Sequence, residues 1–256
     1  MSENLRVLIT VKTYPLPSVK YQELVCTAGV LPDGSLVRLY PINYRNLPYF
    51  QWFSKYQWVN VVVERNSRDP RPESFRPIPN APIHSLGPPL GTNNNWEERK
   101  SVVLAKGVQT MCDLKSLPQN QCSLGIIRPR SVSDFTIKKT GGLWKPRIEA
   151  LLRQQCLFGP DRKPLEKIPY KFSYSFICED PECKGHKMMI EDWEIGELYR
   201  NMQIKFRNEE TAVQKVKQKF YDQICSRDRD THFFVGTVLK HGTWVILGAF
   251  WPKKEQ

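Results

Sequence analysis

Three side chains that could bind a metal ion lie close together near the start of the last third of the chain. Cys178, Cys183 and His186 fall within the nine-residue segment Cys178-Glu-Asp-Pro-Glu-Cys-Lys-Gly-His186. Zinc prefers thiolate and imidazole ligands, and a reversal between two strands commonly supplies such ligands at short spacing. Pro181 and Gly185 favour a tight reversal. The segment therefore predicts a zinc cofactor held by Cys178, Cys183 and His186.

A fourth ligand is missing from the segment itself. The more distant candidates are Cys156, Cys225, His232 and His241. Water in the fourth position would instead give an open and potentially catalytic site. A third alternative is a hairpin loop whose thiols bind no metal. A structural role for the metal is favoured over a catalytic one, because the neighbouring residues include no obvious base held by a partner.

Aromatic and basic residues alternate between positions 38 and 58. Proteins bind single-stranded nucleic acid by stacking bases on aromatic rings while Lys and Arg follow the phosphates. The candidate contact residues in this run are Arg38, Tyr40, Tyr44, Arg45, Tyr49, Trp52 and Lys55. A second basic cluster follows at Arg65, Arg68 and Arg71, where the planar guanidinium suits phosphate recognition. The competing interpretation is that the aromatic residues form the core of the fold.

Two groups of acidic residues could form catalytic sites. Glu191-Asp192-Trp193-Glu194 lacks the strand-borne acid and the acid-x-Lys step that would favour a metal-dependent nuclease, and acidic residues at a helix N-terminus explain it better. Asp228, Asp230 and His232 are typical of a polar turn. No glycine-rich phosphate-binding motif occurs. The sequence therefore predicts no catalytic residue and leaves open whether the protein is an enzyme.

The charge of the chain narrows the class of partner. Its 256 residues carry 38 Lys and Arg against 26 Asp and Glu, a net charge of +12. Such a surplus favours polyanions, because each Lys or Arg that contacts a phosphate releases counterions.

The 7 cysteines, odd in number and mostly scattered, indicate reduced thiols. No apolar run reaches the roughly 18 residues of a membrane span, and no signal segment is evident, so we expect a cytoplasmic protein that does not interact with membranes.

Strand signals dominate the first 65 residues. Apolar runs at 5–12, 23–31, 35–40 and 56–65 are separated by turns, including Asp33-Gly34, and predict a small OB-like barrel. Prolines recur through 66–95 and predict an extended surface arm that is neither helix nor central strand. Residues 96–256 are expected to form an α+β domain with a Cys/His hairpin, in which strand 170–178 pairs with 186–190. The predicted fold class is α+β and mostly β.

Four short segments resemble an uncharacterised family of bacterial proteins that is described as having tandem OB-like domains. They are Val11-Lys-Thr-Tyr-Pro15, Val37-Arg-Leu-Tyr-Pro-Ile42, Cys183-Lys-Gly-His186 with Asp192-Trp193-Glu194, and Phe234-Val-Gly-Thr237. The resemblance spans most of the chain. It implies a bacterial cytoplasmic protein, but it implies no activity and no catalytic residues.

Charge and aromatic content together favour a nucleic-acid-binding protein without intrinsic catalysis, working as a subunit of a larger DNA- or RNA-handling assembly with protein partners. The sequence does not discriminate DNA from RNA. The main rival is a metal-dependent nuclease. The third hypothesis is an adaptor whose basic surface meets an acidic protein.

Overall fold

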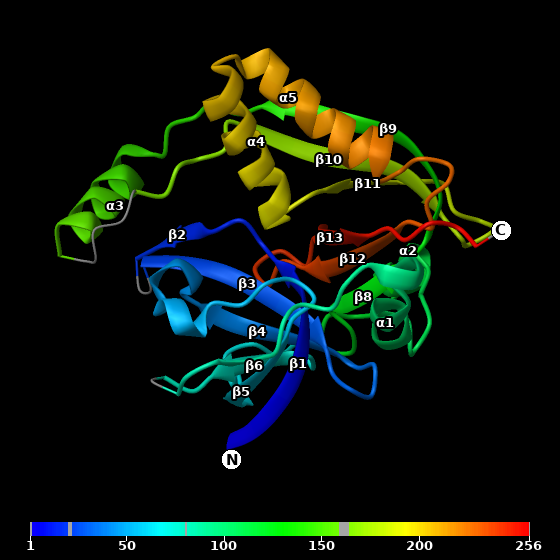
Figure 1. Ribbon diagram of the computed structural model, residues 1–256, viewed down its shortest axis with the longest axis horizontal. Helices are drawn as coiled ribbons and strands as arrows, with labels where there is room; N and C mark the ends of the chain where they lie inside the picture. Colours follow the sequence, from blue (N-terminus) through cyan, green and yellow to red (C-terminus); the bar gives the residue numbers. More distant parts are fainter. Residues whose placement is uncertain (1, 20–21, 80, 159–163, 256) are drawn as a thin grey trace.

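A computed structural model of the chain describes residues 2–19, 22–79, 81–158 and 164–255. A barrel of strands forms one half of the molecule, and two smaller sheets with flanking helices form the other (Figure 1). The strands outnumber the helices, so the predicted α+β class with mostly β structure is confirmed.

The N-terminal half is a closed barrel of five strands, as its strand signals predict. The strands are β1 (Ser2–Lys12), β3 (Gln22–Val30), β4 (Leu36–Ile42), β5 (Trp58–Arg65) and β6 (Ser74–Pro77). Their order is β1-β3-β4-β6-β5, and β5 pairs back onto β1 to close the barrel. The β4–β6 pair is parallel and the other four are antiparallel. Alternate residues such as Val59, Val61 and Val63 point inward and fill the barrel.

The proline-rich segment contributes a barrel strand, which corrects the expectation of an extended surface arm. Within 66–95, β6 lies between β4 and β5, and β7 (His84–Leu86) extends the sheet beside β5. Prolines flank β6 and end it at Pro77, where a strand tolerates the lost N–H, while Ser74 and Phe75 are buried. The proline content led us to exclude strands from the whole segment. The few residues between the prolines were nevertheless enough to pair with β4 and β5.

Short elements accompany the strands of the barrel. Strand β2 (Leu16–Ser18) pairs with β3. Two 3-10 helices, η1 (Tyr44–Asn46) and η2 (Tyr49–Gln51), connect β4 to β5. Helix α1 (Asn93–Val103) follows β7 and leads into the second half.

The C-terminal half contains two three-stranded sheets, and the described residues form no second closed barrel there. One sheet has the order β11-β10-β9 and the other β13-β12-β8. The first is built from β9 (Pro129–Lys139), β10 (Tyr170–Cys178) and β11 (His186–Met189), which confirms the predicted hairpin around the Cys/His segment. The second is built from β8 (Leu124–Ile127), β12 (His232–Thr237) and β13 (Trp244–Phe250).

Helices cover the first of these sheets. Helices α4 (Trp193–Phe206) and α5 (Glu209–Lys217) lie across the sheet formed by β9, β10 and β11 (Figure 1). Helix α5 continues into a π-helical turn, η3 (Gln218–Gln223). Aromatic residues of β10 pack against Phe220 and against Phe233 of the second sheet, so one core joins both sheets. Helices α2 (Met111–Ser116) and α3 (Pro146–Phe158) complete the half.

Candidate functional site

Four potential metal ligands from three elements converge beside the β10–β11 hairpin. Cys178 ends β10, His186 begins β11, and Cys183 lies in the reversal between them. Cys112 comes from the first turn of α2. The three sulfurs and one imidazole nitrogen all lie within 4.8 Å of one another. The structure therefore brings the three predicted ligands together and adds a fourth, so that the cluster could hold a metal ion.

The spacing of these atoms matches the edges of a tetrahedral coordination sphere. Zn–S bonds of ~2.3 Å and Zn–N bonds of ~2.0–2.1 Å place two sulfurs ~3.8 Å apart and a sulfur and a nitrogen ~3.5 Å apart. The Sγ atoms of Cys112 and Cys178 are 3.7 Å apart. The Nε2 atom of His186 lies 3.6 Å from Sγ of Cys112 and 3.3 Å from Sγ of Cys183. The donor set and its size thus fit zinc.

The hairpin backbone is folded toward the Cys183 sulfur. The backbone N–H groups of Cys178 and Gly185 both donate to this Sγ, each at 3.4 Å. Gly185 has φ of +101°, a conformation that side-chain-bearing residues rarely adopt. Two N–H donors stabilise negative charge on the sulfur, and the thiolate is the form that binds metals. The loop is consequently shaped to present a ligand.

Burial makes the thiolate form of Cys112 unfavourable without a cation. Burial, together with hydrogen bonds to the thiols of Cys178 and Cys183, raises the pKa of the Cys112 thiol to about 12, whereas for Cys178 burial is outweighed by hydrogen bonds that lower the pKa. Burial also lowers the pKa of His186, as does the nearby Lys115 ammonium, so the imidazole is held neutral, its metal-binding form. A divalent cation would remove the penalty on the Cys112 thiolate.

The fourth ligand corrects the candidates drawn from the sequence. Cys225 donates its thiol to the carbonyl oxygen of Phe220, and His232 contacts the carbonyl oxygen of Asp230. His241 lies in the turn between β12 and β13, and the side chain of Cys156 lies outside the described residues. Cys112 is far from the hairpin in the sequence and shows no ligand spacing. Its one local signal is the Thr110 cap that starts α2 and orients its first turn.

Two of the predicted phosphate contacts, Arg38 and Arg71, are buried in a polar network between the two halves. Arg38 is 1% exposed and donates to the hydroxyl of Ser123 at 2.7 Å and to its carbonyl oxygen at 3.0 Å. Arg71 is paired with Asp69 at 2.7 Å and donates to the carbonyl oxygen of Thr237. Buried charge of this kind requires partners and cannot meet a phosphate in solution. These two assignments are therefore wrong.

The aromatic–basic run between positions 38 and 58 divides into core and surface. Tyr44 is buried in the barrel core, and Tyr40 is partly buried. The Lys55 ammonium is enclosed beside Asp192 at 3.2 Å and Glu194 at 3.0 Å, and Arg45 is paired with Glu23 at 2.8 Å. These contacts correct the assignment of Tyr44 and Lys55 as exposed nucleic-acid contacts.

Other predicted contacts remain on the surface. Tyr49 is 85% exposed and Trp52 is 41% exposed, both at helix η2. Arg65 and Arg68 are exposed on the barrel, where the Arg65 guanidinium lies over the ring of Phe75. The structure does not bring these two pairs into one site with the buried members of the run.

The acidic group at 191–194 starts a helix, as predicted. Asp192 is the N-cap of α4, and its carboxylate accepts a hydrogen bond from the backbone N–H of Glu194 at 3.0 Å. Burial raises the pKa of Asp192 to about 6, against the opposing attraction of Lys55. Sequence reasoning placed these acidic residues at a helix N-terminus. It did not predict that Lys55 of the barrel would pair with Asp192 and Glu194.

Basic side chains surround a hollow next to the metal cluster, which we call the cationic hollow. Its volume is about 430 Å³, and its charged lining comprises Arg128, Arg130, Arg227, Arg229 and Lys254 with Glu179 and Asp230. Glu179 follows the ligand Cys178 directly, and Cys178 pairs with Pro129 across the sheet. The metal cluster thus fixes one wall of the hollow. Sequence reasoning missed this site because its residues come from four separate segments of the chain.

The carboxylates leave most of this positive charge uncompensated. Asp230 lies 3.0 Å from the Nε atom of Arg128. The guanidinium of Arg229 stacks over the ring of Trp251, 5.0 Å from its centroid. Five lining cations against two lining carboxylates leave a net charge of +3 on one concave surface, and Asp228, outside the lining, lies 3.6 Å from Arg229. Such a surface is suited to binding a polyanion.

None of the helices in the described part of the chain combines the length and apolar character needed to cross a lipid bilayer.

Comparison with known proteins gives relatives but no activity. No curated protein matches the chain. A solved structure of a murine DNA-binding protein bound to double-stranded DNA aligns over 99% of this chain and 97% of the other, at 10% identity and a TM-score of 0.32. A likeness of that size supports no argument about fold or function. 

Two family models match in tandem, and the boundary between the two matched segments lies near residue 106. They are Domain of unknown function (DUF8758) at residues 3–105 and Domain of unknown function (DUF8757) at residues 107–256. The tandem arrangement confirms the expected uncharacterised family, whereas a bacterial origin stays a prediction. The chain belongs to the family defined by Domain of unknown function (DUF8757), preceded by a DUF8758 domain.

Proposed function

We propose that this protein binds nucleic acid through the cationic hollow, and that a zinc ion in the neighbouring Cys/His cluster holds the hollow in shape. The observation that carries the proposal is the concentration of Arg128, Arg130, Arg227, Arg229 and Lys254 around one concave surface. Guanidinium groups bind phosphate oxygens through paired N–H donors, and four of the five cations are arginines.

An aromatic side chain lies beside this surface. Trp251 has the Arg229 guanidinium over its ring at 5.0 Å and the Lys219 ammonium over its ring at 4.2 Å. Stacking rings flanked by cations are the combination that single-stranded nucleic-acid sites use. This combination replaces the run 38–58 as the favoured binding surface, because the cations of that run are enclosed or paired.

Zinc is the ion that the donor set favours. Three thiolates and one imidazole at tetrahedral spacing are typical of closed structural zinc sites, which leave no position open for water. In such a site the metal would fix the end of β10 against α2. The role proposed here is structural, and elemental analysis of the purified protein tests it.

Binding itself is tested by fluorescence anisotropy with labelled single- and double-stranded DNA and RNA. If roughly three to five phosphates are contacted, affinity should fall by about 40- to 500-fold between 50 and 200 mM salt, because each contact contributes about 0.9 to the slope of log affinity against log salt. If none of the four nucleic acids binds at low salt, the proposal is wrong, and an acidic protein becomes the favoured partner of this surface.

A further inference from the structure

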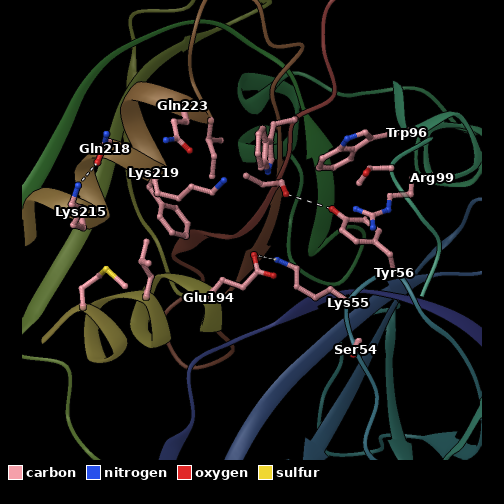
Figure 2. A pocket seen from close by; sticks show the side chains of 17 residues that line it. Ser54, Lys55, Tyr56, Trp96, Arg99, Glu194, Lys215, Gln218, Lys219 and Gln223 are labelled. Atoms are coloured by element: carbon pink, nitrogen blue, oxygen red, sulfur yellow. Dashed lines mark hydrogen bonds and ion pairs between the residues drawn. The ribbon is translucent and has the colours of Figure 1, made fainter. Parts of the chain in front are cut away.

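A second, larger cavity lies where the two halves of the chain meet. Its volume is about 670 Å³, and Figure 2 shows its lining side chains. The barrel supplies Ser54, Lys55 and Tyr56, α1 supplies Trp96 and Arg99, and the remaining walls come from α4, from α5 with its π-helical turn, and from the end of the chain after β13. A volume of this size is typical of sites for small organic ligands, which often lie at domain interfaces.

Aromatic rings form one wall of the cavity. The rings of Trp96 and Trp251 are 5.4 Å apart at an interplanar angle of 64°, and those of Tyr56 and Trp96 are 6.1 Å apart at 70°. Both tryptophans are only partly buried, so part of each ring remains accessible from the cavity. A planar ligand ring could stack on either tryptophan.

Cationic side chains stand around these rings. The Arg99 guanidinium lies 3.9 Å from the ring centroid of Tyr56, and the Lys219 ammonium lies 4.2 Å from that of Trp251. Lys215 is exposed at the rim and hydrogen-bonded to Gln218 at 3.0 Å. A ligand that stacks on Trp251 would therefore have positive charge beside it, which favours an anionic group on the ligand.

One carboxylate is aimed into the cavity and held there. Glu194 receives the Lys55 ammonium at 3.0 Å, as Figure 2 shows, while 59% of its side chain stays exposed. Burial raises the pKa of Glu194, but the charge of Lys55 and its hydrogen bond outweigh this and lower the pKa overall. An ionised carboxylate only accepts hydrogen bonds, so it suits the N–H groups at the edge of a nucleobase. The amides of Gln218 and Gln223 line the same cavity and can both donate and accept.

The backbone around the cavity departs from regular structure at three places. Tyr56 has φ of +61° and Trp96 has φ of +65°, although neither is glycine. The turn that carries Lys219 and Gln223 is π-helical. Strained residues persist where the surrounding structure holds them, and they gather at ligand sites, as do π-helical turns. Here all three features line one cavity.

We propose that this cavity binds a nucleotide, with the base stacked on Trp96 or Trp251, the base edge on Glu194 and the glutamines, and the phosphate beside Lys219 and Lys215. The site goes beyond the polyanion surface proposed above: it shares Trp251 and Lys219 with the edge of that surface, and its other lining residues lie outside the cationic hollow. A free mononucleotide and the terminal nucleotide of a bound strand offer the same chemistry.

The test is a titration of the full-length protein with mononucleotides of the four common bases, followed by tryptophan fluorescence. At least one mononucleotide should quench the emission in a saturable way, whereas inorganic phosphate alone should not. Replacing Lys219 with Gln and, separately, Trp251 with Leu should each weaken that binding. For the tryptophan we expect roughly 5- to 150-fold, the range found for loss of one base–aromatic stack. The control, Trp52→Leu, removes an exposed tryptophan outside the cavity and should leave affinity unchanged.

Melting temperature shows whether each variant folds, and Lys219→Gln retains a side chain of similar reach if Trp251→Leu does not fold. No saturable binding of any mononucleotide up to millimolar concentration would overturn the proposal, as would equal binding by wild type and a folded Lys219→Gln variant. Competition between a mononucleotide and an oligonucleotide distinguishes a free nucleotide from the terminal nucleotide of a strand as the ligand of the cavity. A saturating mononucleotide should displace a labelled oligonucleotide if the cavity takes a strand end, and leave it bound if the cavity takes a free nucleotide. Arg130→Gln with Arg227→Gln, two substitutions in the cationic hollow outside the cavity lining, should not alter mononucleotide affinity, so the two proposals can fail separately.

Discussion

Arg38 is held by the interior of the protein, and its energetics follow from that position. Its guanidinium donates to Ser74 and Ser123, and the carboxylates of Asp69 and Glu73 belong to the same network. Ser123 follows the boundary between the two matched domains, so this network joins the halves. Buried ionic groups are costly to leave without partners.

Replacing Arg38 with Ala should therefore lower the free energy of unfolding by about 3–5 kcal/mol, because it removes the buried donor to Ser74 and Ser123, and each buried polar group left without a partner costs about 1–3 kcal/mol. Urea unfolding measures the loss. Arg68→Ala is the matched control, since Arg68 is exposed, and it should change stability by no more than about 0.5 kcal/mol. A stable Arg38→Ala variant with weakened nucleic-acid binding would restore Arg38 as a phosphate contact.

Lys12 gives the protein a distinct dependence on pH. Burial and the nearby charge of Lys55 together lower its pKa from the usual 10.5 to about 8. The folded pKa lies below the unfolded one, so between about pH 8 and 10.5 the unfolded chain binds more protons. The contribution of Lys12 to stability is thus fully present above the unfolded pKa and is lost as the pH falls through the folded pKa.

Lys12→Met should remove this contribution. Near pH 9 the free energy of unfolding of the wild type should rise with pH by up to ~1.4 kcal/mol per pH unit relative to the variant. Chemical denaturation of both proteins at pH 7.5, 8.5 and 9.5 provides the comparison. Parallel curves for the two proteins would show that Lys12 is not perturbed.

At the level of residues, the sequence predicted which side chains would lie together where they are close in the chain. Cys178, Cys183 and His186 lie in one hairpin, so their spacing already brought them together. Arg38 and Arg71 failed because alternation of charged and aromatic residues does not reveal which side of a strand is buried. Both arginines were assigned to the surface because they are charged. Hydrogen-bond partners from distant segments, Ser123 and Thr237, allow them to be buried.

At the scale of elements, α2 contacts the hairpin between β10 and β11 through the side chain of Cys112. The cluster has one ligand from α2 and three from the hairpin, and a metal bound there would join them. Metal binding to such a site contributes directly to the free energy of folding. The cationic hollow begins one residue after Cys178, so its shape should depend on the same ion.

Purified protein should accordingly contain about one zinc per chain, and Cys112→Ser should reduce both the zinc content and the melting temperature. Cys26→Ser is the control, because Cys26 lies on β3 of the barrel, outside the cluster. Elemental analysis and thermal unfolding measure the two effects. Less than about 0.1 zinc per chain in the wild type, or full retention of zinc by Cys112→Ser, would contradict a zinc site with these four ligands.

Elements with local signals were predictable, and those that needed distant partners were not. Alternation of apolar residues predicted β10, and α5 begins at a local cap, where Asn208 accepts a hydrogen bond from the backbone N–H of Thr211 at 2.8 Å. Strand β6 is only four residues long and lies among prolines, so its strand character depends on β4 and β5. The π-helical turn likewise had no sequence signal.

For the whole molecule, the closed barrel and the two smaller sheets place the cationic hollow away from the run 38–58 that charge and aromatic density first suggested, whereas the larger cavity includes Lys55 and Tyr56 of that run. The overall charge of +12 directed attention to polyanions, but it could not show where the charge gathers. That location depends on segments 128–130, 225–231 and Lys254 meeting in space.

The salt dependence of oligonucleotide binding by charge variants tests the central claim most directly. Arg130→Gln with Arg227→Gln removes two exposed cations of the cationic hollow, and Arg68→Gln with Lys205→Gln removes two exposed cations elsewhere. If the hollow binds the phosphates, the first pair should flatten the slope of log affinity against log salt by about 1.4 to 1.8, and the second pair should leave it unchanged. Equal slopes for the wild type and the Arg130/Arg227 variant would contradict the account.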